Sequence, residues 1–289
     1  MTTTATPGKP RARRPNAAAI ILVAATAVGF AAPARGQTVP EDPREAKPER
    51  PTVATHAHVV ARGIVELEMG GQFQHPAPGA SLFLVPTLFK IGLAARVQMD
   101  IAPGLQRISA AGESISGLTD SQVGIKWQLT AGAPVVGDFA LQSLLKLPTG
   151  SIVNGSGTGT TDLNLLAISS HAFGPVALDI NVGYTRRSGD RSIVPKSSMS
   201  WTCSAAVELT ERVGWVGEVF GYPGTAGPSG APAIVAFLTG PTFVVQKYFV
   251  IDAGAIVNVS GFGGTAVYAG LTWNMGRLWT PPQRPQRTR

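Results

Sequence analysis

The sequence predicts an all-β protein, a closed antiparallel up-and-down transmembrane β-barrel of about 12 strands. Three observations lead to this prediction. Apolar and polar residues alternate with a period of two between residues 64 and 276, as they do in strands with two unlike faces. The alternating segments are mostly nine to twelve residues long, which suits a tilted transmembrane strand better than a strand of a soluble sheet. The connections between them also differ in length in a regular way.

Individual segments show the alternation clearly. Val123, Ile125 and Trp127 are separated by small or polar residues, and the pattern recurs at 176–184 and 267–275. No segment of the body shows a sustained helical period. We expect strands at 64–74, 82–91, 94–102, 119–130, 136–147, 161–172, 175–185, 199–210, 213–221, 232–243, 247–258 and 264–276.

The connections fall into two alternating classes. One class is mostly long and rich in Gly, Ser and Pro, at 75–81, 103–118, 148–160, 186–198, 222–231 and 259–263. The other class is short, at 92–93, 131–135, 173–174, 211–212 and 244–246. An outer-membrane barrel has short periplasmic turns and longer outer loops. A secreted β-sandwich also alternates, but it has no reason to sort its loops by length, and its solvated faces would carry more charge.

The start of the chain predicts export. Residues 1–36 combine an Arg cluster, a short apolar run and small residues, with cleavage after Ala34 or Gly36, and this pattern is typical of a signal peptide. Residues 37–63 are polar and proline-rich and predict a disordered linker. The barrel is expected at 64–276 and a basic C-terminal tail at 277–289. The expected location is the cell outer membrane.

The formal charge of +7 is an average over unlike parts of the chain. Nine of the 24 basic residues lie in 1–36 and 277–289, which hold no acid, so the remainder carries 15 basic residues against 17 acids. The body is therefore slightly acidic and offers no basic face for nucleic acid. Only 14% of residues are charged, against about 25% in an ordinary soluble domain.

The few charged residues on the polar faces of the expected strands are the candidates for a functional lumen. These residues are Glu66, Glu68, Arg96, Asp100, Lys126, Lys146, Asp179, Glu208 and Asp252. Two interpretations remain open. The charges form a selectivity filter, or they neutralise one another and hold the lumen together, which we favour slightly.

The sequence offers little support for catalysis. His56 and His58 are two ligands without a suitably spaced carboxylate, so a solvated linker pair is favoured over a metal site. Ser170 and His171 point to opposite faces of a strand. Ser169 and His171 share a face but lie about 6.6 Å apart along the strand, which we expect to be too far for a direct hydrogen bond. We therefore expect no enzyme, no metal and no cofactor.

Several segments resemble a known family. They are the strand–turn–strand at 86–101, the Gly-Leu-Thr-Asp segment within 117–127, the Leu-Pro-Thr-Gly loop at 146–151 with 157–162, and the segments 181–184 and 269–273. Together they look like the outer-membrane barrels named for the phenol meta-cleavage degradation pathway. The resemblance spans about 64–276. The loop 148–160 lacks charges found in many relatives, and Trp279 is followed by ten residues where such barrels usually end on an aromatic residue.

The resemblance implies passive passage of small hydrophobic or aromatic molecules through an outer-membrane barrel. It also implies outer-membrane lipid and the outer-membrane assembly machinery as partners. The alternative function is a structural or surface-interaction barrel that binds partners through its outer loops at 103–118, 148–160 and 186–198.

Overall fold

A computed structural model describes residues 42–188, 196–222, 234–261 and 264–280. Within these ranges the regular structure is entirely β, and no helix there is long and apolar enough to cross a membrane. The predicted signal peptide lies outside the described residues, as do residues 281–289 of the predicted tail. Parts of the predicted loops 186–198, 222–231 and 259–263 lie outside them too.

The described residues form fourteen strands. They are β1 (Ile64–Ala77), β2 (Ala80–Ala94), β3 (Val97–Ala102), β4 (Gly104–Ala110), β5 (Glu113–Leu118), β6 (Ser121–Ala133), β7 (Gly137–Leu147), β8 (Asp162–Phe173), β9 (Val176–Arg187), β10 (Ser197–Thr210), β11 (Val213–Tyr222), β12 (Ile234–Gln246), β13 (Phe249–Gly261) and β14 (Ala266–Arg277).

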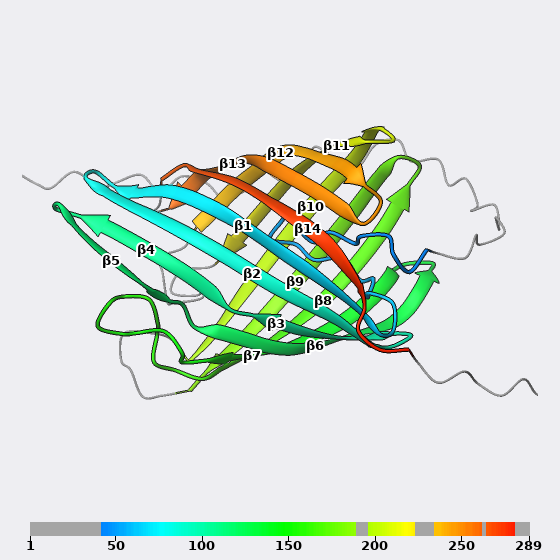
Figure 1. Cartoon of the computed structure of the whole chain (residues 1–289), viewed down its shortest axis with the longest axis horizontal. Helices are drawn as coiled ribbons and strands as arrows, with labels where there is room; N and C mark the ends of the chain where they lie inside the picture. Colours follow the sequence, from blue (N-terminus) through cyan, green and yellow to red (C-terminus); the bar gives the residue numbers. More distant parts are fainter. Residues whose placement is uncertain (1–41, 189–195, 223–233, 262–263, 281–289) are drawn as a thin grey trace, which may run out of the picture. The chain divides into compact units, whose positions relative to one another are not determined.

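These strands fill twelve positions in the wall of one closed barrel (Figure 1). β3 and β4 follow each other along β2, interrupted at Pro103, which has no N–H to donate to the ladder. β5 and β6 share the next position. Neighbouring strands are antiparallel, and the sheet closes because β1 pairs with both β14 and β2. The closed twelve-strand antiparallel barrel confirms the predicted fold class.

The barrel has two unlike ends, which we call the turn end and the loop end. The turn end carries the short connections between β2 and β3, β6 and β7, β8 and β9, β10 and β11, and β12 and β13. Apart from the breaks between β3 and β4 and between β5 and β6, which lie within the wall, the other six connections are at the loop end, and four of these six are longer than any at the turn end. β1 begins and β14 finishes at the turn end, where Ile64 pairs with Arg277.

The predicted outer loop 103–118 is wrong. Most of it is the β4–β5 hairpin, in which Ala111 and Gly112 form a two-residue turn with φ of 52° and 84°. Two successive positive φ values suit the right-handed twist of paired strands. The predicted loop 75–81 likewise shortens to a tight turn between β1 and β2. The segment 103–118 is rich in Gly and Ser, and 75–81 contains two prolines and a glycine. Such residues indicate a loop when read alone but are tolerated at the ends of strands once a neighbour pairs with them.

The two faces of the wall are chemically opposite. On β6 the outward Trp127 is 54% exposed, whereas Lys126 beside it faces inward and is fully buried. Trp201, Trp215 and Trp273 also point outward. An apolar outer surface around a polar, charged interior reverses the arrangement of a soluble protein and is typical of a barrel surrounded by lipid.

Candidate functional site in the barrel lumen

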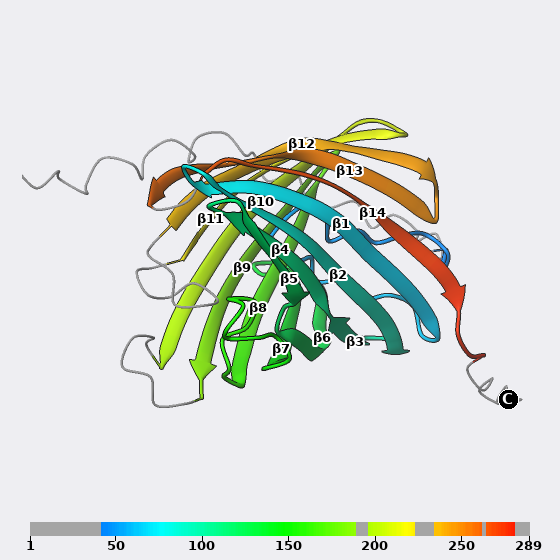
Figure 2. The same ribbon diagram turned by 60° about the vertical axis from the view of Figure 1, so that its left-hand side comes forward.

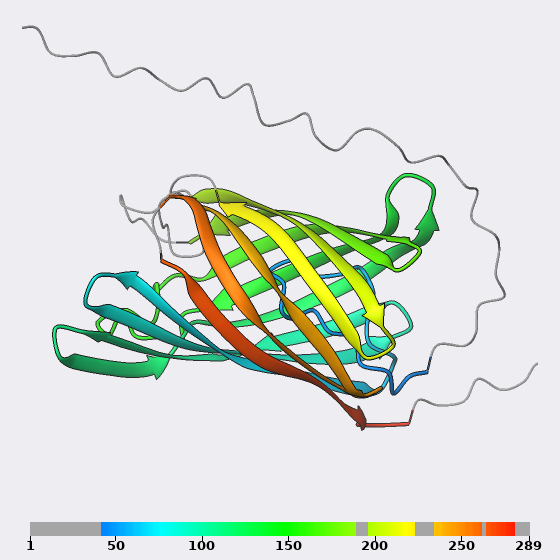
Figure 3. The same cartoon turned by 90° about the horizontal axis from the view of Figure 1, so that it is seen from above.

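Residues 42–63 lie inside the barrel. This segment, which we call the plug, enters at the turn end and returns there to join β1 at Ile64, and it is the dark blue trace within the wall in Figure 2 and Figure 3. The structure differs here from the predicted disordered linker. The physical reason is that inward side chains of the wall bind the plug through its main chain.

Three wall carboxylates accept hydrogen bonds from plug N–H groups. Glu66 accepts from Lys47 N at 2.9 Å and Glu68 from Glu49 N at 2.7 Å. The two carboxylate oxygens of Glu218 accept from two consecutive N–H groups of the plug, at 2.7 Å each. Charge-assisted hydrogen bonds of this kind are about twice as strong as neutral ones.

Wall amides and hydroxyls continue the pattern along the plug. Asn181 accepts from Thr55 N at 2.7 Å and donates to Thr55 O at 2.9 Å, as a neighbouring strand would. The Oγ of Ser170 accepts from Ala57 N at 2.8 Å, and the Oε1 of Gln98 accepts from a plug N–H at 2.9 Å. Because these contacts use the main chain, a polar proline-rich segment is ordered without an apolar core of its own.

Two fully buried lysines complete the contact between wall and plug. Lys90 Nζ lies 2.7 Å from a Glu66 oxygen and 2.6 Å from a Glu68 oxygen, and it also donates to a plug carbonyl. Lys126 Nζ pairs with Glu49 and donates to Thr55 Oγ1 at 2.9 Å. An ammonium group buried without such partners would cost several kcal/mol in desolvation.

The titratable groups of the plug respond to this surrounding charge. Burial by itself would raise the pKa of Glu49, but the ammonium groups of Lys126 and Lys90 outweigh it and lower that pKa below its ordinary value. Burial, together with the charge of Lys126, lowers the pKa of His56 well below its ordinary value, so the imidazole is neutral. His56 is therefore part of a packed interface and not the solvated linker residue that the sequence predicts.

The two histidines of the plug, His56 and His58, lie side by side. The rings of His56 and His58 lie 5.3 Å apart, and His58 Nδ1 lies 3.5 Å from an Asp138 oxygen. The described residues contain no group of three or more His, Cys, Asp or Glu side chains that could hold a metal ion.

Nearer the loop end, one side of the inward surface is apolar. A buried cluster joins inward side chains of β11, β12 and β14, and partly buried apolar residues pack on it. The cluster consists of Val216, Phe220, Ala236, Leu238 and Tyr268, with Ala206, Tyr222, Ile234 and Ile256 around it. On β2, Leu82 and Leu84 alternate with the outward Phe83 and so also face the lumen.

The connection 148–161 is fastened to the wall at the loop end by Asp120. The Asp120 carboxylate accepts from Gly150 N at 3.1 Å, from Thr158 N at 2.9 Å and from Thr158 Oγ1 at 2.7 Å. Lys146 Nζ lies 3.1 Å from Asp120 and 2.8 Å from Asp162, so it joins two carboxylates beside the connection. One side chain therefore holds both ends of this segment in place.

We expect Asp120→Ala to release the connection 148–161 from the wall. The substitution removes the acceptor of three hydrogen bonds, each contributing about 1 kcal/mol or more, so hydrogen exchange at the Gly150 and Thr158 amides should accelerate by roughly tenfold or more. Hydrogen-exchange mass spectrometry measures this directly. Asp138→Ala, at the turn end, is the control; equal protection of 148–161 in both variants would contradict the fastening role.

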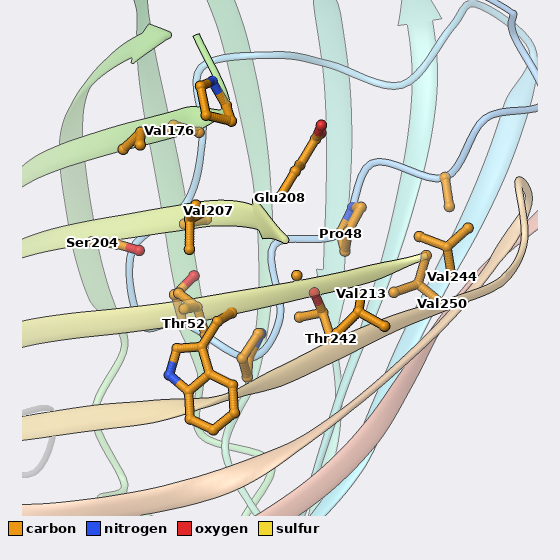
Figure 4. Close-up of a pocket in the computed structure, with 18 of the residues that line it drawn as sticks. Pro48, Thr52, Val176, Ser204, Val207, Glu208, Val213, Thr242, Val244 and Val250 are labelled. Atoms are coloured by element: carbon orange, nitrogen blue, oxygen red, sulfur yellow. The ribbon is translucent and has the colours of Figure 1, made fainter. Parts of the chain in front are cut away.

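The plug leaves two cavities at the turn end. One, of about 610 Å³, lies between the plug and strands β9 to β13. In Figure 4, Pro48 and Thr52 of the plug lie across this cavity from the wall, which contributes Val213, Val250 and Glu208. The other cavity, of about 590 Å³, is lined by the plug and the turns near β3 and β7.

The structure distributes the nine lumen candidates unevenly. Five are buried in the lumen, namely Glu66, Glu68, Asp100, Lys126 and Asp252. Lys146 lies beside the fastened connection, and Asp179 accepts from Ser170 Oγ at 2.5 Å. Glu208 faces the 610 Å³ cavity and is exposed. Arg96 is not in the lumen cluster, because it lies in the exposed turn 95–96 and donates to Leu129 O at 3.2 Å.

Sequence reasoning missed several residues that bind the plug or its partners. The missed residues include Lys90, Gln98, Gln142, Asn181, Glu218 and Asn274. Each lies on the inward face, so the alternation could have found them. The amides, and Lys90 after the inward leucines of β2, stand out less than carboxylates do. Glu218 is a carboxylate, but it lies between Val216 and Phe220 on a face that is otherwise apolar. Gln98 and Gln142 donate to Asp100 at 2.7 and 2.6 Å.

The expected separation of Ser169 and His171 is wrong. Ser169 Oγ lies 3.0 Å from His171 Nε2, because side chains on one face lean along the strand and the imidazole extends back toward the serine. Both residues face outward near the turn end. Ser169 Oγ also donates to Val136 O at 2.9 Å, which directs the hydroxyl proton away from the imidazole.

The barrel resembles solved structures of outer-membrane proteins. No protein-family model matches the sequence, and no curated protein matches it. The crystal structure of the COG4313 outer membrane channel from Pseudomonas putida F1 matches with a TM-score of 0.57 and 13% identity, over 75% of this chain and 97% of that one. The chain has the fold of an outer-membrane channel.

Two further channels match less closely. The CymD monoaromatic hydrocarbon channel gives a TM-score of 0.45 at 9% identity, over 76% of this chain and 90% of that one. The Ralstonia pickettii toluene transporter TbuX gives 0.43 at 8% identity, over 76% and 91%. The apolar outer surface of the present barrel itself agrees with a wall in contact with lipid.

Proposed function

We propose that the chain is an outer-membrane channel that gives passive passage to small hydrophobic or aromatic molecules, and that the plug closes it at rest. The observation that carries the proposal is the inward apolar surface at the loop end, formed by the cluster around Phe220 and Tyr268 and by the leucines of β2. A water-filled general pore does not require an apolar lumen surface. An apolar solute that contacts such a surface is stabilised, because apolar area is removed from water.

The plug then separates this apolar region from the turn end. Its main chain is held by at least three carboxylates and several amides of the wall, so a solute crosses only when part of the plug moves. The two cavities beside the plug supply room at the turn end for a solute that has passed. The resemblance of segments such as 146–151 to the family named for the phenol meta-cleavage pathway supports the same class of solute. The proposal assigns no catalytic step to the chain.

The proposal is tested by uptake into cells that carry the chain in their outer membrane. We expect these cells to take up the hydrophobic aromatic probe N-phenylnaphthylamine faster than cells without the chain, as a faster rise in fluorescence. Leu84→Trp, which narrows the lumen, should remove most of the added uptake. Phe83→Trp is the matched control, since it is the next residue but faces outward. Equal uptake in the two variants would contradict passage through the lumen.

A further inference from the structure

Arg50 of the plug occupies a notch in the wall. Gly70 on β1 is opposite Gly270 on β14, and Gly270 is opposite Asp252 on β13, so the three residues form one row across neighbouring strands. The guanidinium of Arg50 lies over this row. A Cβ atom on either glycine would lie 2.6 Å from Cζ of Arg50. The notch therefore exists because both positions lack a side chain.

Asp252 forms the end of the notch and binds the guanidinium with both oxygens. Arg50 Nε lies 3.2 Å from one carboxylate oxygen and Nη2 lies 3.2 Å from the other. The side chain of Asp252 is only 2% exposed. A buried carboxylate with two oxygens directed at a planar group is a recognition geometry for a guanidinium or an amidinium, which present two parallel N–H donors.

The notch adjoins the 610 Å³ cavity. Arg50 itself lines that cavity. Pro48, Val213 and Val250, which are labelled in Figure 4, line it too. A molecule that displaced the Arg50 side chain could therefore place its cationic group over the two glycines and its apolar body among the valines. The cavity at the turn end supplies the space that such a body needs.

We propose that this notch is a binding site for a guanidinium or amidinium group carried on a small apolar or aromatic solute, in competition with Arg50. The flat space between the two glycine positions fits a planar cation. The binding site stands on the geometry of the notch alone. A ligand in the notch would also release Arg50 from Asp252 and so loosen the plug. This consequence rests on the proposed function.

The test uses the full chain in detergent micelles and isothermal titration calorimetry. Benzamidine is the probe, and benzamide, which has the same shape without the charge, is the control ligand. We expect Arg50→Ala to bind benzamidine about tenfold or more tighter than benzamide. Benzamidine forms a charged pair with Asp252, and the neutral benzamide cannot. The unsubstituted chain should bind benzamidine more weakly than Arg50→Ala does, since its own arginine competes.

A second variant fills the notch without altering its carboxylate. Adding Gly270→Ala to Arg50→Ala should abolish the preference for benzamidine, while retained heat-modifiable migration on a gel shows that the barrel is folded. Equal affinity for the two ligands in Arg50→Ala would overturn the proposal. Equal benzamidine affinity with and without Arg50, or affinity that survives Gly270→Ala, would overturn it as well. If the chain bound benzamidine specifically but failed the uptake test, the binding-site proposal would stand and only the proposed channel function would be rejected.

Discussion

Glu218→Gln is expected to open the barrel by releasing the middle of the plug. Both oxygens of Glu218 accept plug N–H groups at 2.7 Å, and the side chain is 1% exposed. Glutamine keeps one acceptor but turns an NH₂ group, which is a donor, toward the second N–H. The loss of one charge-assisted bond and the unpaired donors together cost about 2 kcal/mol. This shifts the population of the displaced plug by roughly thirtyfold.

Single-channel recordings in planar bilayers measure this shift as the fraction of time spent conducting. Glu208→Gln is the matched control, because Glu208 is also an inward glutamate but is exposed and accepts no bond from the plug among the described residues. It should conduct like the unsubstituted chain. If Glu218→Gln stayed closed, or if the two variants conducted alike, the plug would not be the barrier that these bonds hold in place.

The wall could be predicted from the sequence because lipid on one side and a polar lumen on the other force strict alternation. Val123, Ile125 and Trp127 are outward and exposed as this alternation requires, and Lys126 between them is buried. The ends of strands were less predictable. Ala111 and Gly112 lie in a run of Gly, Ala and Ser that has no apolar face to mark it as paired, so the β4–β5 hairpin resembled a loop.

The plug could not be predicted from its own composition. Its prolines and mixed charges cannot bury enough apolar surface to fold alone, and that property indicates disorder in an isolated chain. What orders the plug is a set of acceptors on strands far along the sequence, such as Asn181 and Glu218, that bind its main chain. Main-chain recognition leaves little trace in the sequence of the segment that is recognised.

The alternation along the strands predicted the buried lumen charges in part. Glu66, Glu68 and Asp252 stand out as acids on an otherwise uncharged face, and the structure buries all three. Arg96 follows the same alternation but lies beyond the strand end, in the turn 95–96, where small errors of boundary change the face on which a residue lies. Of the two interpretations left open, mutual neutralisation describes Lys90 and Lys126, each of which pairs with glutamates in the lumen.

Lys90→Met is expected to cause the largest loss of stability. Lys90 is 0% exposed and lies 2.7 Å from Glu66 and 2.6 Å from Glu68. Methionine fills a similar volume but leaves two buried carboxylates without their cation. Removing one partner of a buried ion pair costs about 3–5 kcal/mol, mostly because the remaining charge is desolvated and uncompensated. Guanidinium unfolding of the barrel in lipid vesicles measures the change.

Two comparisons separate the buried charge from the loss of a lysine as such. Lys247→Met removes a lysine whose side chain is 61% exposed and pairs with Asp42, and an exposed pair of this kind contributes little to stability because water screens it. Adding Glu66→Gln and Glu68→Gln to Lys90→Met removes the uncompensated charges, so most of the lost stability should return. The deficit of Lys90→Met alone should also shrink at acidic pH, where protonation neutralises the carboxylates. If Lys90→Met and Lys247→Met lowered the stability equally little, the cluster of Lys90, Glu66 and Glu68 would not be a main contributor to stability. Water would then compensate the charges of the two carboxylates.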